Sequence, residues 1–137
     1  MRAFFRISLL LAMLIFVEGV EAKSKGGALL TADRVTHDFG VINSRGGDVH
    51  CTFTVTNDGD EPLVIERVVT SCSCTKANIS RKPLAAGESR EMRVTYEVKK
   101  MPIGLFSKSI LIFSTSRDED MMRFTITGRS SYKHRKD

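Results

Sequence analysis

The sequence predicts an all-β protein built as a sandwich of two antiparallel sheets. Segments rich in Val, Ile, Thr and Phe alternate with turns rich in Gly, Asp, Asn and Pro, which is typical of such sandwiches. Within these segments apolar and polar residues alternate, so each strand has one buried and one solvated face. This alternation argues against a parallel sheet, whose strands are apolar on both faces.

An export signal is expected at residues 1–22. Arg2 and Arg6 give a positive start, and Ile7–Val17 is an apolar run of 11 residues. Val20–Ala22 places small or medium residues where signal peptidase reads them, so we expect cleavage after this segment. The apolar run is shorter than the roughly 20 residues that span a bilayer. We therefore favour a periplasmic or extracytoplasmic protein that has no membrane span after cleavage. The alternative is that the segment stays uncleaved and anchors the protein in the membrane.

Three further segments are expected after the signal. Residues 23–30 form a flexible leader, residues 31–130 a single domain and residues 131–137 a basic tail. The chain carries a formal net charge of +5, part of which lies in this tail. Its basic residues are not interleaved with aromatic ones as on surfaces that bind single strands, so no nucleic-acid partner is expected.

The first half of the domain is expected to hold four strands. Val35–Phe39 is a short first strand, and Val49–Val55 alternates apolar residues with His and Thr. A tight turn follows, in which Gly59 is able to take positive φ. Leu63–Val68 is the third strand, and residues 76–83 hold a short fourth one.

The second half is expected to hold three more strands, over Met92–Val98, Phe106–Ile112 and Met122–Ile126. Polar turns separate them. Seven strands in about 100 residues predict an immunoglobulin-like seven-stranded antiparallel β-sandwich. The apolar faces of its two sheets would pack about 10 Å apart.

Five motifs, in this order, resemble one bacterial family. They are His37-Asp38-Phe39-Gly40-Val41-Ile42, Phe53-Thr54-Val55-Thr56-Asn57-Asp58-Gly59, Pro62-Leu63-Val64-Ile65, Ser71-Cys72-Ser73-Cys74-Thr75 and Pro83-Leu84-Ala85-Ala86-Gly87-Glu88. From about residue 33 to 128 the chain is similar to domain of unknown function 1573. The resemblance implies an exported immunoglobulin-like sandwich, related to the ASH/Hydin domains and to the major sperm protein, without an established activity. Cys51 and Ser73 depart from the family pattern.

Three cysteines, Cys51, Cys72 and Cys74, allow at most one disulfide within the chain. Export would place them in an oxidising compartment. The favoured hypothesis is structural, with Cys72 and Cys74 tying the end of a strand to the following loop. Residues two apart in an extended strand have Cα atoms about 6.5–7 Å apart, so a bond there needs a local turn. Cys51 is expected to be a buried thiol, but a bridge from it to either of the others stays open.

Metal binding or redox chemistry through Cys72-Ser73-Cys74 is the alternative. Thiolate sulfur selects Cu(I) or Zn(II), and two ligands leave a tetrahedral zinc site half filled. His37, His50 or a Met residue would have to complete it, and the sequence does not bring these near. Lys76 would lower the pKa of a thiol if it lay close, but no thioredoxin-like context is found. We therefore expect no cofactor, with copper or zinc as the alternative.

No catalytic residue is assigned. His37 and Asp38 are adjacent and so face opposite sides of a strand, and residues 118–120 are expected to be a solvated hairpin tip. The expected function is a non-enzymatic interaction or structural module with a protein partner in the cell envelope. Such sandwiches recruit partners through edge strands, here Thr36–Gly40 or the segment after Cys74.

Overall fold

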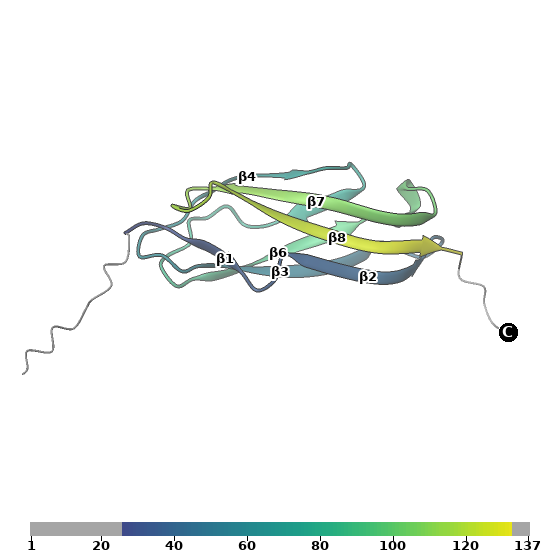
Figure 1. Cartoon of the computed structure of the whole chain (residues 1–137), viewed down its shortest axis with the longest axis horizontal. Coiled ribbons are helices and arrows are strands. Elements are labelled where there is room, and N and C mark those ends of the chain that lie inside the picture. Colours follow the sequence, from purple (N-terminus) through teal and green to yellow (C-terminus); the bar gives the residue numbers. More distant parts are fainter. Residues whose placement is uncertain (1–25, 133–137) are drawn as a thin grey trace, which may run out of the picture.

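The computed structural model describes residues 26–132 (Figure 1). The predicted signal peptide, residues 23–25 of the expected leader and residues 133–137 of the expected tail lie outside the described part. Within that part, no helix has the length and hydrophobicity needed to cross a membrane.

Apart from one short 3₁₀ turn, every regular element of the described chain is a strand, so the all-β prediction is confirmed. The strands are β1 (Leu30–Ala32), β2 (Thr36–Asn43), β3 (Val49–Asn57), β4 (Ile65–Thr70), β5 (Thr75–Asn78), β6 (Ser89–Tyr96), β7 (Gly104–Ser114) and β8 (Met121–Ser131), with one 3₁₀ turn, η1 (Val98–Lys100). The predicted count of seven is one too low. The missed strand is β1, whose three residues are too few to show a period of two.

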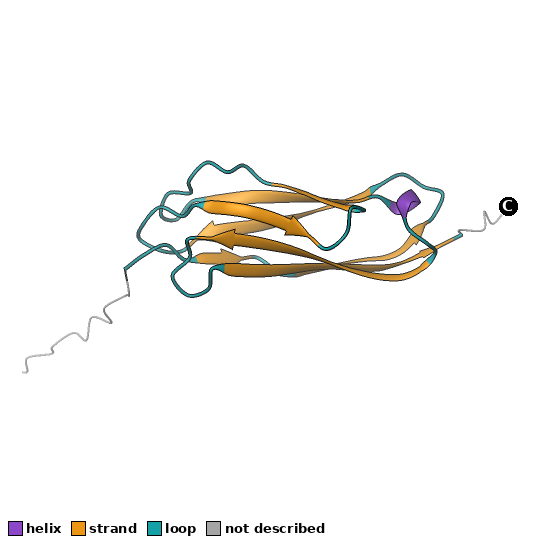
Figure 2. Ribbon diagram, turned by 90° about the horizontal axis from the view of Figure 1, so that it is seen from above, coloured by secondary structure: helices purple, strands orange, loops and turns teal. Residues whose placement is uncertain are grey.

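The strands form two four-stranded sheets, in the orders β1-β3-β6-β5 and β2-β8-β7-β4. Figures 1 and 2 show the two sheets packed face to face, which confirms the predicted immunoglobulin-like sandwich. One pairing corrects the prediction, because β2 runs parallel to β8. The chain moves from the edge of one sheet to the edge of the other between β1 and β2 without turning back, so β2 keeps the direction of β1 (Figure 1).

Asp33 fixes this crossing between the sheets. Its amide N–H donates to the carbonyl of Thr54 at 3.0 Å, and its carboxylate accepts from the Thr54 N–H at 3.0 Å. The bond from the Thr54 backbone holds the pKa of Asp33 below its usual value. Two residues later, the Val35 carbonyl accepts from the Thr125 N–H of β8 at 2.8 Å. The crossing backbone is therefore hydrogen-bonded to both sheets.

The folded domain begins before the boundary that was expected from the sequence. Leu30, placed in the flexible leader, is 6% exposed, and the Asp58 N–H donates to the Leu29 carbonyl at 2.8 Å. Gly59 lies against the same segment, where an added Cβ would collide with the Gly27 carbonyl. Gly59 does not take the positive φ that a glycine in this turn would allow. This glycine is needed because two backbones approach closely there.

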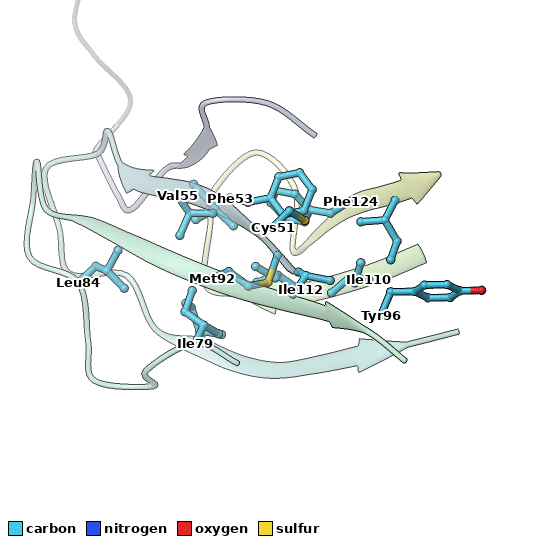
Figure 3. Packing of buried hydrophobic residues seen from close by; sticks show 14 of the residues in the cluster. Cys51, Phe53, Val55, Ile79, Leu84, Met92, Tyr96, Ile110, Ile112 and Phe124 are labelled. Carbon is cyan, nitrogen blue, oxygen red and sulfur yellow. The ribbon is translucent and has the colours of Figure 1, made fainter. Parts of the chain in front are cut away.

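The buried side chains of the two sheets form one core (Figure 3). Phe53 of β3 contacts Phe124 of β8, with ring centroids 5.0 Å apart and planes at 56°. Both rings are fully buried, and burial of such a side chain stabilises the fold by about 1.5–3 kcal/mol. The inward positions predicted on the long strands are confirmed by the burial of Cys51, Phe53, Val55, Met92, Val94, Tyr96, Ile110, Ile112, Phe124 and Ile126. Val98, predicted as the end of a strand, is also buried but lies in η1.

Gly59→Ala is expected to lower the free energy of unfolding by about 1–3 kcal/mol, because backbone must shift to make room for the methyl group. Gly47→Ala is the matched control, since nothing lies within 4 Å of a Cβ at that position. Urea unfolding of the two variants measures the difference. Equal midpoints would contradict the close approach of the two backbones.

Candidate functional site

The chain passes from one sheet to the other in the turn between β4 and β5, and this turn contains the cysteine pair. A disulfide joins Cys72 to Cys74, whose Cα atoms are 5.1 Å apart. The Thr75 N–H donates to the Cys72 carbonyl at 3.1 Å and closes the turn. The Cα atoms are closer than they would be in an extended strand, so the local turn permits the bond.

The two sulfur atoms of this bond differ in access. Cys74 is fully buried, whereas Cys72 is half-buried. A thiolate arriving from solvent therefore reaches the sulfur of Cys72, and Cys74 is the leaving group. The bond closes a very short loop, so it contributes little by restricting the unfolded chain.

Glu97 organises the charges beside this turn. Its amide N–H donates to the Cys74 carbonyl at 2.7 Å, and its carboxylate pairs with Lys100 at 2.5 Å and with Lys76 at 2.7 Å. Hydrogen bonds from Lys100 and Lys76 lower the pKa of Glu97, and the bond to Glu97 raises the pKa of Lys76. Lys76 therefore pairs with Glu97 in this structure, which was not expected from the sequence.

The histidines considered as additional metal ligands lie away from the cysteines. His37 packs edge-on against a neighbouring Phe ring of β2, and His50 Nδ1 lies 2.8 Å from Thr95 Oγ1. The described part of the chain contains no cluster of three or more His, Cys, Asp or Glu side chains that would hold a metal ion. A thioether lies close instead, because Met101 Sδ is 3.9 Å from Cys72 Sγ. The two residues are 29 positions apart, so their spacing in the sequence could not reveal this contact.

Cys51 is a free thiol on β3 and is 7% exposed. It faces the core, and burial raises its pKa. Neither of the bridges from Cys51 that the sequence left open is formed, because Cys72 and Cys74 bond to each other. Cys51 packs as a small apolar side chain.

A β-bulge interrupts β2 between Asp38 and Val41. The Asp38 carboxylate accepts from the Gly40 N–H at 2.8 Å, and Gly40 has φ of 66°, a conformation that favours glycine. The bulge shifts the alternation, so Ile42 is buried while Val41 is exposed. Asp38 therefore shapes the bulge.

An open groove of about 570 Å³ lies on the outer face of the second sheet, beside this bulge. Residues of β2, β7 and β8 line it. Val41 on β2 is 71% exposed and Leu105 on β7 is 77% exposed, more than any other large apolar residue in the described part. The strand register places both opposite Arg129 of β8, so Arg129 lies between two exposed apolar residues.

Both edges that were expected to meet a partner are edge strands in the structure. Within residues 26–132, Thr36–Gly40 lies in β2, which pairs only with β8, and the segment after Cys74 is β5, which pairs only with β6. The other two edges belong to β1 and β4.

The four edges are not equally open. The Arg117 N–H donates to the Ala28 carbonyl at 2.9 Å just before β1, which has three residues. The Arg81 guanidinium donates to the Glu66 carbonyl of β4 at 2.8 Å. β5 has four residues, whereas β2 has eight. The longest edge is therefore β2, which borders the groove.

The family described as protein of unknown function DUF1573 matches residues 30–130. The chain belongs to this family. In this DUF1573 protein the match begins at the start of β1 and ends one residue before the end of β8. Among the curated proteins, none matches the sequence.

Solved structures similar to this DUF1573 protein include one of a protein of unknown function from Porphyromonas gingivalis W83, with a TM-score of 0.69 and 17% identity over 76% of this chain. The chain spans 47% of that protein, about half its length. ASH/PapD-like domain 7 of human CEP192 has a TM-score of 0.63 and 9% identity, over 77% of this chain and 87% of that one. The YadV chaperone has a TM-score of 0.51 and 11% identity, over 79% of this chain and 54% of that one. At these identities the likeness establishes the fold alone.

Thiol counting with a chromogenic disulfide reagent tests the cysteine arrangement. We expect no rapidly reacting thiol in the native protein, one after unfolding without reductant and three after reduction, because Cys51 is buried and free and the other two are bonded. Cys51→Ala is the control. It should show no reactive thiol in the native protein, none after unfolding without reductant and two after reduction. Three reactive thiols in the unfolded, unreduced protein would show that the bond is absent.

Glu97→Gln is expected to lower the free energy of unfolding at neutral pH, because the ion pairs to Lys76 and Lys100 are lost. The pKa of Glu97 is lowered in the folded state. Its stabilising effect is therefore present above the unfolded carboxyl pKa of about 4.3 and disappears as pH falls through the lower folded value. Urea unfolding at about pH 7 and about pH 3 should show the deficit of the variant shrinking in acid. Glu119→Gln, in an exposed loop, is the control and should show no comparable change in the free energy of unfolding. A loss of stability in Glu97→Gln that is the same at both pH values would contradict the ion pairing of Glu97.

Proposed function

We propose that this protein is a non-enzymatic binding module of the cell envelope, which adds an extended segment of a partner protein to the free edge of β2. The observation that carries the proposal is the position of the longest free edge beside an apolar groove. Export to the envelope is part of the proposal, and the predicted signal at residues 1–22 supports it.

The free edge of β2 has the properties of a strand acceptor. Among the strands of the described residues, β2 pairs with β8 alone, so its other side presents backbone N–H and C=O groups to an incoming strand. Proteins commonly protect such edges with Lys, Pro or a β-bulge. β2 contains no Lys or Pro, and its bulge is confined to residues 38–41. The edge of β5 carries Lys76, and Arg81 reaches over β4. The structure thus favours β2 among the four edges.

The groove supplies the means of selecting a partner. Side chains of an added strand that point to the outer face would meet Val41, and long ones would reach Arg129. A carboxylate on the partner would pair with Arg129, and an apolar side chain would cover Val41 or Leu105, which are otherwise left in water. The partner is therefore expected to offer an extended segment that carries both an apolar and an acidic residue.

Proteins of the same fold support a role in protein binding. The YadV chaperone and the periplasmic chaperone SfaE share the sandwich at 11% and 9% identity. This chain shares only the fold with those chaperones. The contacts proposed here are argued from its own β2 and groove.

A pull-down from envelope extract with the purified protein as bait tests the proposal. Val41→Glu and Leu105→Glu should each reduce recovery of the partner by about tenfold or more, because each places a carboxylate where an apolar contact is expected and repels the acidic residue of the partner. Val69→Glu is the matched control, since Val69 is 41% exposed on β4, the opposite edge of the same sheet.

Unfolding midpoints of the three variants should agree, which separates lost binding from lost stability. Recovery of no specific protein by the unaltered bait would contradict the proposal. An equal loss with Val69→Glu would place the binding surface elsewhere.

A further inference from the structure

We propose that reduction of the disulfide between Cys72 and Cys74 opens a site for one copper(I) ion, with the two thiolates and the thioether of Met101 as ligands. The inference is independent of the partner proposed above. It rests on three sulfur atoms that come together from two separate parts of the chain.

The sulfur spacing fits a single metal ion. Met101 Sδ lies 3.9 Å from Cys72 Sγ. Two sulfurs bound to one ion at about 2.3 Å lie about 3.8–4.0 Å apart when the bond angle is tetrahedral or trigonal. The Cα atoms of Cys72 and Cys74 are 5.1 Å apart, so rotation of the two side chains after reduction separates their sulfurs without moving the backbone.

Met101 is held in place independently of the disulfide. It follows η1, and its amide N–H donates to the Val98 carbonyl at 3.3 Å. Val98 is 1% exposed and anchors this turn in the core. The Glu97 N–H donates to the Cys74 carbonyl at 2.7 Å, which joins η1 to the cysteine turn. The thioether therefore stays beside the thiols whether or not they are bonded to each other.

The surroundings of the two cysteine sulfurs favour thiolates. The Cys74 N–H lies 3.1 Å from Cys72 Sγ, and the Thr75 hydroxyl lies 3.6 Å from Cys74 Sγ. Both groups donate to sulfur when it is negative. An ion with charge +1 and two thiolates form a group with charge −1. Glu97, the carboxylate beside the cysteine turn, is paired with both Lys76 and Lys100, so it adds no uncompensated negative charge there.

The kind of ligand selects the kind of ion. Thiolate and thioether sulfur are soft ligands that favour Cu(I), whereas zinc sites use Cys, His and carboxylate side chains. No His, Asp or Glu joins the cysteines in a cluster within residues 26–132. Three sulfur ligands therefore point to Cu(I) in preference to Zn(II).

Opening of the site is a two-electron reduction by a dithiol. A thiolate of the reductant attacks Cys72 Sγ, the more accessible sulfur, and Cys74 leaves as a thiolate that takes up a proton. The second thiol of the reductant attacks the mixed disulfide and releases Cys72, and the reductant leaves as a disulfide. Binding of Cu(I) then releases the protons of both protein thiols, and the copper remains Cu(I).

The test uses Cu(I) as its acetonitrile complex, titrated without oxygen into phosphine-reduced protein in competition with a chromophoric Cu(I) chelator. The protein carries Cys51→Ala so that only the two proposed thiols remain. We expect one Cu(I) per chain in the reduced protein and none in the oxidised protein. X-ray absorption should show three sulfur neighbours.

Met101→Leu is expected to weaken Cu(I) binding at least tenfold and to reduce the sulfur neighbours from three to two. Met122→Leu is the matched control, because Met122 is also half-buried against the core, and it should change neither value. Cys72→Ser should abolish binding, with circular dichroism showing that the fold is kept.

Three outcomes would overturn the proposal. They are failure of the reduced protein to bind Cu(I) in stoichiometric amount, unchanged affinity and sulfur count in Met101→Leu, and tighter binding of Zn(II) than of Cu(I). Because the measurement uses the purified protein alone, its failure would not bear on partner binding at β2.

Discussion

The burial of two apolar sheet faces against each other, centred on the contact of Phe53 with Phe124, is the constraint on which the rest of the structure depends. A strand that slipped by one residue would turn its apolar side chains out to water, so this burial fixes the register of every long strand. Once the register is fixed, the segments between strands must cross from sheet to sheet at defined places. The hydrogen bonds of Asp33 hold the crossing between β1 and β2, and the cysteine turn forms the crossing between β4 and β5.

The fold was predictable wherever apolar and polar residues alternate over several positions of the sequence. The inward faces of β3, β6 and β8 follow from this pattern and hold in the structure. The pattern failed at β1, which is too short to show it, and could not reveal that β2 lies parallel to β8. Relative strand direction depends on how the chain crosses between sheets, and this is decided by contacts that are distant in sequence, such as those of Asp33.

The candidate sites were predictable only in part. The sequence singled out Cys72 and Cys74 and required a turn between them, which the structure contains. It could not find Met101, because that contact depends on where η1 lies in space. Nor could it find the groove, because the bulge at Gly40 exposes Val41, which simple alternation from Phe39 would place toward the core.

The parallel pairing of β2 with β8 has a mechanical consequence. The two ends of the described chain lie at opposite ends of the sandwich (Figure 1). Tension at the N-terminal end is met first by β1 and Asp33, which are bonded to β3. Any force that passes them draws β2 toward one end and β8 toward the other, so the hydrogen bonds along this pair share the load in shear. A domain tethered at one terminus and pulled at the other would resist extension through this pair of strands.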